Sequence, residues 1–333
     1  MDKAALQFNG CKPFRIDTHY HIFPPKFMAN QAKRNLKPYD PRQVVPATIN
    51  LRNWTPGFAL EELDAAGIST AIAQMIAAPG IWFGDVAAAR DLAREWNEYA
   101  AQMARDFPGR FGMFAVLPLP DVDCALREIE YALDTLHADG VQIMSHYDSR
   151  YPGDPQLRPV LEELNRRSAV VFVHPFLPPC HNVLPNVRPA IIEFPFDTTR
   201  AIVSLVLSGT TVQLPDIRFI FTHGGGALPS LAGRVEELTK DDKDRAARIP
   251  NGIAFEFRKL YYEIANAYHR PAFAALREFA PESHILFGTD YPYLTVAAHV
   301  QGLEKAEPSA SARSAIERDN AVALFPRFAK AIA

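Results

Sequence analysis

Strand-like apolar runs alternate with helix-like segments along almost the whole chain, and this alternation most constrains the fold. The runs cover residues 14–17, 69–75, 110–117, 140–145, 169–174, 217–223, 260–265 and 285–290. Such alternation favours parallel strands that are joined by helical crossovers. The fifth run (AVVFVH) is almost wholly apolar, as expected of a strand buried on both faces. Eight units in 333 residues predict a single-domain (β/α)8 TIM barrel spanning 1–333.

The segments between the runs predict crossover helices and three insertions. Helices are expected at 58–67, 84–107, 121–137, 155–167, 196–208, 228–238, 295–304 and 309–325. Residues 22–57, 175–195 and 239–258 lack clear periodicity and contain many of the 28 prolines. Long loops in a compact domain are usually functional, so we expect them to cap the site. A doubly wound open sheet is the alternative, but no G-x-G-x-x-G follows the first run.

Histidine or aspartate ends several of these runs. His19 and His21 follow the first run, His174 ends the fifth, His223 the sixth and Asp290 the eighth. Alternate side chains of a strand share a face, so His19 and His21 should converge. In a (β/α)8 barrel the carboxyl ends of the strands form the catalytic face. The five side chains are therefore predicted to gather at one mouth of the barrel.

Histidine nitrogens combined with one carboxylate suit a borderline divalent ion. We predict one metal ion held by His19, His21, His174 and Asp290, with Zn²⁺ favoured and Mn²⁺ the alternative. His223 is predicted to be either a further ligand or an acid/base group. Residues 141–144 contain no lysine or acidic residue to bridge a second ion, which favours a mononuclear site.

The remaining histidines are expected at the surface or in the core. Of His137, His146, His181, His269, His284 and His299, only His146 and His181 follow strand-like runs toward the catalytic face. The stretch His223-Gly-Gly-Gly could form the oxyanion loop of an α/β-hydrolase. That enzyme class needs a G-x-S-x-G elbow, which the sequence lacks. The glycines more simply let the backbone pass close to a metal or substrate.

Composition narrows the possible partners and location. A net charge of −3 without a basic cluster argues against nucleic-acid binding. No apolar run approaches the ~18 residues of a membrane span, and the first residues lack a signal-peptide pattern. Three scattered cysteines form neither a metal motif nor a disulfide framework. We expect a cytoplasmic protein with reduced thiols that binds a small molecule and no membrane.

Six ordered motifs resemble the amidohydrolase superfamily, and within it the metal-dependent decarboxylases of the aminocarboxymuconate-semialdehyde and 6-methylsalicylate types. They are DTHYHIFPP at 17–25, LDAAGIS at 63–69, VFVHP at 171–175, AIVSLVLSG at 201–209, FTHGGGALPSLAGRVEE at 221–237 and LFGTDYPY at 286–293. The resemblance implies the four metal ligands above and His223 as the residue that activates water or moves a proton. It also implies that Arg52 and Arg234 bind a substrate carboxylate, Arg234 from a neighbouring subunit of a homodimer. Resorcylate-type relatives carry an acidic residue at the position of His19, which argues against a resorcylate substrate.

The resulting hypothesis is a non-oxidative decarboxylase of a small aromatic or unsaturated carboxylic acid. A divalent ion stabilises developing negative charge, and His223 or Asp290 would deliver the proton. Phe176 and Tyr293, with Phe23, Trp54 and Trp82, would enclose a flat ring, although each equally suits packing of the cap. A lactone or amide hydrolase using Asp290 as base is the alternative enzyme, and a metal-binding barrel without catalysis is a third possibility.

Overall fold

Parallel strands form the centre of this computed structural model, which describes residues 14–34, 54–75, 80–180, 184 and 186–330. The eight strands lie in chain order, and each pairs in parallel with the next. Their bounds are β1 Arg15–His21, β2 Ile68–Gln74, β3 Phe111–Val116, β4 Gly140–Met144, β5 Val170–His174, β6 Arg218–Phe221, β7 Tyr261–Glu263 and β8 Ile285–Leu286.

The last strand returns to the first and closes the sheet. The Thr18 amide donates to the Phe287 carbonyl at 3.0 Å, and the His21 amide donates to the Tyr291 carbonyl at 3.0 Å. The Asp290 amide donates to the His19 carbonyl at 2.8 Å. These bonds join β1 to β8 and the residues after it, so the predicted (β/α)8 barrel is confirmed and the open sheet is wrong.

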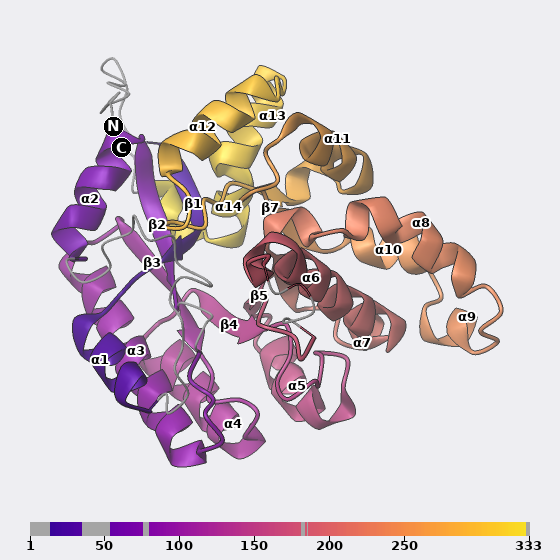
Figure 1. Cartoon of the computed structure of the whole chain (residues 1–333), viewed down its shortest axis with the longest axis horizontal. Coiled ribbons are helices and arrows are strands. Elements are labelled where there is room, and N and C mark those ends of the chain that lie inside the picture. Colours follow the sequence, from indigo (N-terminus) through magenta and orange to yellow (C-terminus); the bar gives the residue numbers. More distant parts are fainter. Residues whose placement is uncertain (1–13, 35–53, 76–79, 181–183, 185, 331–333) are drawn as a thin grey trace.

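Helices surround the strands (Figure 1). They are α1 Pro25–Arg34, α2 Pro56–Ala65, α3 Val86–Asp106, α4 Val122–Glu130, α5 Arg158–Arg166, α6 Pro189–Leu207, α7 Thr210–Gln213, α8 Leu228–Leu238, α9 Arg245–Arg248, α10 Ile253–Arg258, α11 Arg270–Phe279, α12 Val296–Lys305, α13 Ala310–Ser314 and α14 Asn320–Leu324. Among the described residues, no helix is long and apolar enough to cross a bilayer.

An apolar plug fills the barrel below its catalytic mouth. Side chains from the strands form it together with the segment after α14: Ile16, Ile72, Phe114, Val170, Phe172, Ile220, Leu286, Phe325 and Phe328. All are at least 95% buried. The Phe172 ring centroid lies 5.1 Å from that of His19, so the plug forms the floor of the histidine site. The site therefore has an apolar floor on the side of the barrel interior.

The first insertion contains a helix that the sequence analysis did not predict. Residues 22–57 were expected to lack regular structure, yet α1 occupies Pro25–Arg34 and α2 begins at Pro56. Proline suits the first turn of a helix because its missing N–H has no partner there. Phe27 is fully buried and Asn30 Nδ2 donates to Glu95 on α3 at 2.8 Å, so α1 is held by tertiary contacts. Arg52 lies outside the described residues.

The other two insertions also carry helices. α6 begins at Pro189 and continues through Pro195, seven residues before the predicted start at 196. Interior proline usually breaks a helix, yet α6 continues through Pro195. Residues 239–258 contain α9 and α10, and Arg248 on α9 donates to the Leu207 carbonyl at the end of α6. The role of these segments as a cap remains a prediction.

Candidate metal centre and active site

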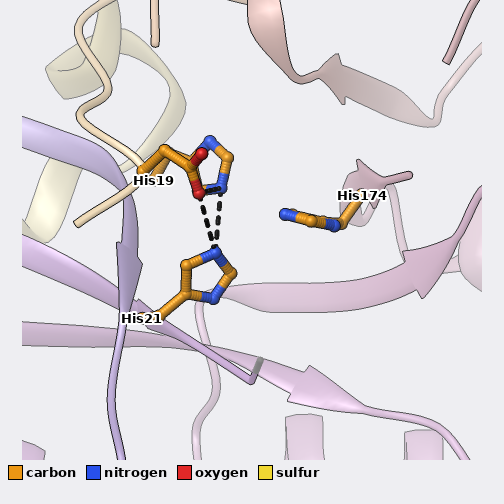
Figure 2. Close-up of side chains that lie close together, drawn as sticks. His19, His21 and His174 are labelled. Atoms are coloured by element: carbon orange, nitrogen blue, oxygen red, sulfur yellow. Dashed lines mark hydrogen bonds and ion pairs between the residues drawn. The ribbon is translucent and has the colours of Figure 1, made fainter. Parts of the chain in front are cut away.

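The barrel brings four of the predicted residues together. One ligand atom from each of His19, His21, His174 and Asp290 lies within 4.8 Å of the others, and all four residues are buried. Nε2 of His19 lies 3.2 Å from Nε2 of His21. Asp290 Oδ1 lies 3.2 Å from the first of these nitrogens and 3.1 Å from the second. Figure 2 shows the three rings pointing toward a common centre.

A hydrogen bond fixes the outer nitrogen of each ring. Nδ1 of His19 lies 2.9 Å from Glu263 Oε1, Nδ1 of His21 lies 3.1 Å from the Met75 carbonyl, and Nδ1 of His174 lies 2.8 Å from the Pro175 carbonyl. Because carbonyls and carboxylates only accept, each Nδ1 carries a proton, and each Nε2 is directed at the centre, where a neutral ring offers its lone pair. Nε2 of His174 is buried without a hydrogen-bond partner among the described residues. This donor set fits a bound cation, which would satisfy that nitrogen.

The electrostatics of the cluster agree with such a ligand set. Burial lowers the pKa of His21, and it holds the pKa of His174 well below its usual range, so both rings are neutral. Burial alone would raise the pKa of Asp290, but the neighbouring histidines hold it well below its usual range. Burial also disfavours a charged His19, yet Glu263 and Asp290 outweigh it and raise its pKa to about 10. The carboxylates thus create a negative environment that favours a cation.

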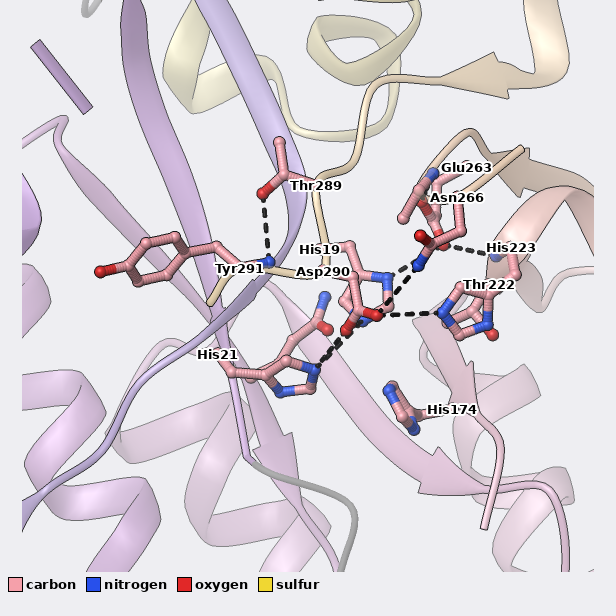
Figure 3. A network of polar contacts seen from close by, with 12 residues as sticks. His19, His21, His174, Thr222, His223, Glu263, Asn266, Thr289, Asp290 and Tyr291 are labelled. Carbon is pink, nitrogen blue, oxygen red and sulfur yellow. Dashed lines mark hydrogen bonds and ion pairs between the residues drawn. The ribbon is translucent and has the colours of Figure 1, made fainter. Parts of the chain in front are cut away.

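His223 lies beside this cluster. It follows β6, and its Nε2 is 3.3 Å from Asp290 Oδ2, the oxygen that faces away from His19 and His21. Its Nδ1 has no hydrogen-bond partner among the described residues. Asn266 also reaches Asp290 Oδ2, donating from Nδ2 at 3.3 Å. His223 is therefore placed to exchange a proton near the cluster (Figure 3).

Strained backbone holds several of these side chains. His223, Asn266 and Asp290 have φ values of 55°, 56° and 55°, in the left-handed region that residues with a Cβ rarely adopt. Each follows a different strand end, β6, β7 or β8. Non-glycine residues with this conformation cluster at functional sites because the surrounding structure must hold them there.

Sequence reasoning missed two buried carboxylates. Glu263 on β7 accepts from the His223 amide at 2.6 Å in addition to its contact with His19. Asp17 on β1 accepts from the Thr289 hydroxyl at 2.6 Å, and burial raises the pKa of its carboxyl to about 7. Both acids are fully buried on strands. Buried carboxylates require partners, and that rule could have identified them as supports of the site.

Two cavities open at this mouth of the barrel. The larger, of about 420 Å³, is lined by His174, His223, Asp290 and Tyr293 among others, so Tyr293 lies where the sequence analysis predicted. Arg188, which precedes α6 and was not predicted, also lines it. Phe176 instead lines a smaller cavity of about 240 Å³. Arg234 is exposed on α8 and is not among the lining residues of either cavity.

Comparison with known proteins identifies the family. The amidohydrolase family model matches residues 16–327. The chain belongs to the amidohydrolase family. The likeness to this family covers the whole barrel, from β1 to the segment after α14. The family resemblance inferred from the six motifs is therefore confirmed.

The amidohydrolase relatives of this chain include named decarboxylases. Decarboxylase yanB of Aspergillus niger is 37% identical over 94% of this chain and 88% of its own length. The 6-methylsalicylic acid decarboxylase acuB of Aspergillus aculeatus is 32% identical over 95% of this chain and 97% of its own length. A 2-amino-3-carboxymuconate-6-semialdehyde decarboxylase of Dictyostelium discoideum is 27% identical over 74% of this chain and 68% of its own length. The chain thus groups with the decarboxylase branch of the amidohydrolases, as the motifs implied.

A solved amidohydrolase structure supports the fold. The 5-carboxyvanillate decarboxylase of Novosphingobium aromaticivorans, complexed with manganese and 4-hydroxy-3-methoxy-5-nitrobenzoic acid, matches with a TM-score of 0.82. The match covers 94% of this chain and 96% of that chain at 21% identity. At this level of identity, the similarity shows that the two chains share the barrel fold.

Proposed function

We propose that this chain is a metal-dependent decarboxylase of a small aromatic or unsaturated carboxylic acid. The observation that carries the proposal is the buried cluster of His19, His21, His174 and Asp290 beside a cavity of about 420 Å³. That volume suits a small ring with a few substituents. The named activity of its relatives supports the same reaction class.

The four clustered residues would hold one divalent ion. A bound divalent ion supplies Lewis-acid stabilisation of negative charge on the reactant. Three histidine nitrogens favour Zn²⁺, whereas Mn²⁺ is present in the structure of 5-carboxyvanillate decarboxylase. We propose Zn²⁺ as the resident ion and Mn²⁺ as the alternative. Glu263 orients His19 and keeps its Nε2 directed at the centre.

His223 is the proposed proton donor. Loss of carbon dioxide breaks the bond between the ring carbon and the carboxylate and leaves the electron pair on that carbon. A proton must then form the new C–H bond. The imidazole of His223 faces the larger cavity, and its Nε2 lies 3.3 Å from Asp290 Oδ2, so it is placed to hand a proton to a reactant bound there. Asp290 therefore serves both as a proposed ligand and as the partner of the proton donor.

Substrate binding is proposed to involve residues around the larger cavity. The Tyr293 ring lies 5.5 Å from that of His21 and would pack against a flat reactant. Arg188 lines the cavity from the same chain and carries the charge that a carboxylate needs. Arg234 is exposed on α8 and is proposed to contribute from the second subunit of a homodimer. Arg52 remains proposed as a further contact to the carboxylate.

A product assay tests the proposed reaction against the hydrolase alternative. The purified protein, loaded in turn with Zn²⁺ and Mn²⁺, is incubated with a panel of 2-hydroxybenzoic acids and with a panel of lactones and amides. We expect carbon dioxide and the corresponding phenol from at least one acid. Cleavage of a lactone or amide without release of carbon dioxide from any acid would instead establish the hydrolase.

A further inference from the structure

A second cavity lies at the same mouth of the barrel, and one of its wall residues, Met75, contacts the histidine cluster through His21. It has a volume of about 240 Å³ and lies at the ends of β2 to β5, where its walls include Met75, Trp82, Met144 and Phe176. The Met75 carbonyl accepts the hydrogen bond from His21 Nδ1. Phe176 follows the predicted ligand His174 by two residues. The smaller cavity is therefore adjacent to the centre but distinct from the larger cavity on the side of β5 to β8.

The hydrogen-bonding groups at its wall are satisfied, with one exception. The Gln142 side chain is bonded to both backbone groups of Met75, at 2.9 and 3.1 Å. The Tyr147 hydroxyl accepts from the Met144 amide at 2.9 Å, and Trp82 Nε1 donates to Asp148 at 3.2 Å. His146 differs: it is 95% buried, and neither ring nitrogen makes a hydrogen bond of normal geometry among the described residues, although the Leu177 backbone lies close to the ring.

The nearest carboxylate does not satisfy His146. Nε2 of His146 lies 3.7 Å from Asp197 Oδ2, which is beyond hydrogen-bond distance. The oxygens of Asp197 already accept from the hydroxyls of Ser145 and Tyr151. An unpaired polar group in the interior is costly, because it gives up its hydrogen bonds to water without replacing them. A partner from outside the chain would remove that cost.

The residues that line the smaller cavity indicate the chemistry of such a partner. Burial lowers the pKa of His146, so the ring is neutral, with one donor and one acceptor nitrogen. None of the described residues that line the cavity is lysine or arginine. Arg200, which acts on His146 electrostatically, is already paired with Asp197 at 3.5 Å, so a second carboxylate would lack a free counter-charge among the described residues, which is unfavourable. Most of the lining side chains are apolar or aromatic, and they favour a hydrocarbon group.

We propose that the smaller cavity is a subsite for an uncharged, largely apolar ring substituent or ring edge that carries a hydroxyl group, and that His146 is the positioning residue that hydrogen-bonds this hydroxyl. The inference rests on the proposed function, because it assigns the cavity to the same aromatic reactant. It adds that this hydroxyl lies within reach of His146, on a neutral and apolar part of the reactant.

Binding of neutral phenols tests the subsite without requiring turnover. The metal-loaded protein is titrated with 3-methylphenol and with toluene, which lacks the hydroxyl. Tryptophan fluorescence reports on the cavity because Trp82 lines it, whereas Trp54 and Trp96 are at least 97% buried elsewhere. We expect a saturable change with 3-methylphenol in the natural protein. The change should vanish in Trp82→Phe, while calorimetry still detects binding.

Variants of His146 separate the hydrogen bond from the cavity itself. Losing one such bond should weaken 3-methylphenol about fivefold to tenfold in His146→Leu and leave toluene unchanged. His146→Gln retains a donor and an acceptor and should stay within about threefold of the natural protein. For a hydroxylated acid, His146→Leu should raise KM by a similar factor with kcat nearly unchanged, because the bond forms in ground and transition states alike.

These binding measurements test the proposed subsite independently of the decarboxylation reaction. Equal affinity of 3-methylphenol for the natural protein and a folded His146→Leu would overturn the proposal, as would the absence of saturable binding at Trp82. If His146→Leu does not fold, the natural protein must still bind 3-methylphenol at least fivefold more tightly than toluene. Phenol binding that depends on His146 without decarboxylation of any acid would leave the subsite standing and remove only the proposed function.

Discussion

Glu263 and His19 share a buried hydrogen bond of 2.9 Å that links the seventh strand of the barrel to the first. The same carboxylate accepts from the His223 amide at 2.6 Å and from the Ala265 amide at 2.5 Å. One side chain thus orients a proposed metal ligand and the loop that carries the proposed proton donor (Figure 3). Carboxylates in this position behind a histidine ligand usually raise metal affinity.

Replacing Glu263 with glutamine should weaken metal binding without removing a ligand. We expect Glu263→Gln to lower metal affinity about tenfold to hundredfold, because the neutral amide no longer supports His19. Titration with a competing chelator measures this. Glu256→Gln is the matched control, since Glu256 on α10 is also buried but pairs with Lys259 instead of a histidine of the cluster. Equal metal affinity in both variants would contradict the role of Glu263.

Removal of His174 should release the ion. His174→Ala deletes the only proposed ligand from β5, so we expect metal content after dialysis to fall from about one equivalent to well below half. Activity should fall at least about 100-fold. His269→Ala is the control, because His269 is exposed outside the cluster. Elemental analysis and the carbon dioxide assay provide the two measurements, and a His174→Ala protein with full metal content would disprove the ligand assignment.

His223 should affect turnover but not metal content. General acid catalysis contributes about 10²–10⁴-fold to rate, so His223→Asn should lower kcat by that factor. Because His223 lies outside the cluster of four, the variant should bind one equivalent of metal as before. Asparagine tolerates the left-handed backbone at this position. Unchanged kcat would exclude His223 as the proton donor.

His299 should make stability depend on pH below neutrality. It is fully buried on α12, and burial lowers its pKa from 6.5 to about 4. The unfolded chain therefore takes up this proton below about pH 6.5, whereas the folded chain does so only near pH 4. The free energy of unfolding should fall by roughly 2–3 kcal/mol as pH falls across that interval. Denaturant unfolding of His299→Gln should show a correspondingly flatter pH dependence, and identical slopes would refute the assignment.

The proposed dimer can be tested through Arg234. We expect the natural protein to sediment as a dimer and Arg234→Ala to raise KM at least tenfold, because a carboxylate contact is lost. Arg245→Ala on the neighbouring α9 offers a control arginine. A protein that is active as a monomer, with normal KM in Arg234→Ala, would exclude this role.

Much of the barrel could be predicted because its strands are buried and therefore apolar. The placement of His19, His21, His174 and Asp290 at one mouth followed from the strand ends alone. The helix α1 could not be predicted in this way, because its burial depends on contacts with α3 such as Asn30 with Glu95. The role of Glu263 depends on how β7 faces β1 across the barrel. Likewise, strand order alone could not tell which cavity Phe176 would line.

The left-handed backbone at His223, Asn266 and Asp290 has a consequence for how this protein can evolve. Each such residue costs on the order of 1 kcal/mol, which glycine would recover. Selection for heat resistance alone would therefore act against this strain, and a more stable barrel obtained in that way would lose side chains that the proposed chemistry needs. Retention of side chains there during laboratory evolution would mark them as kept for activity.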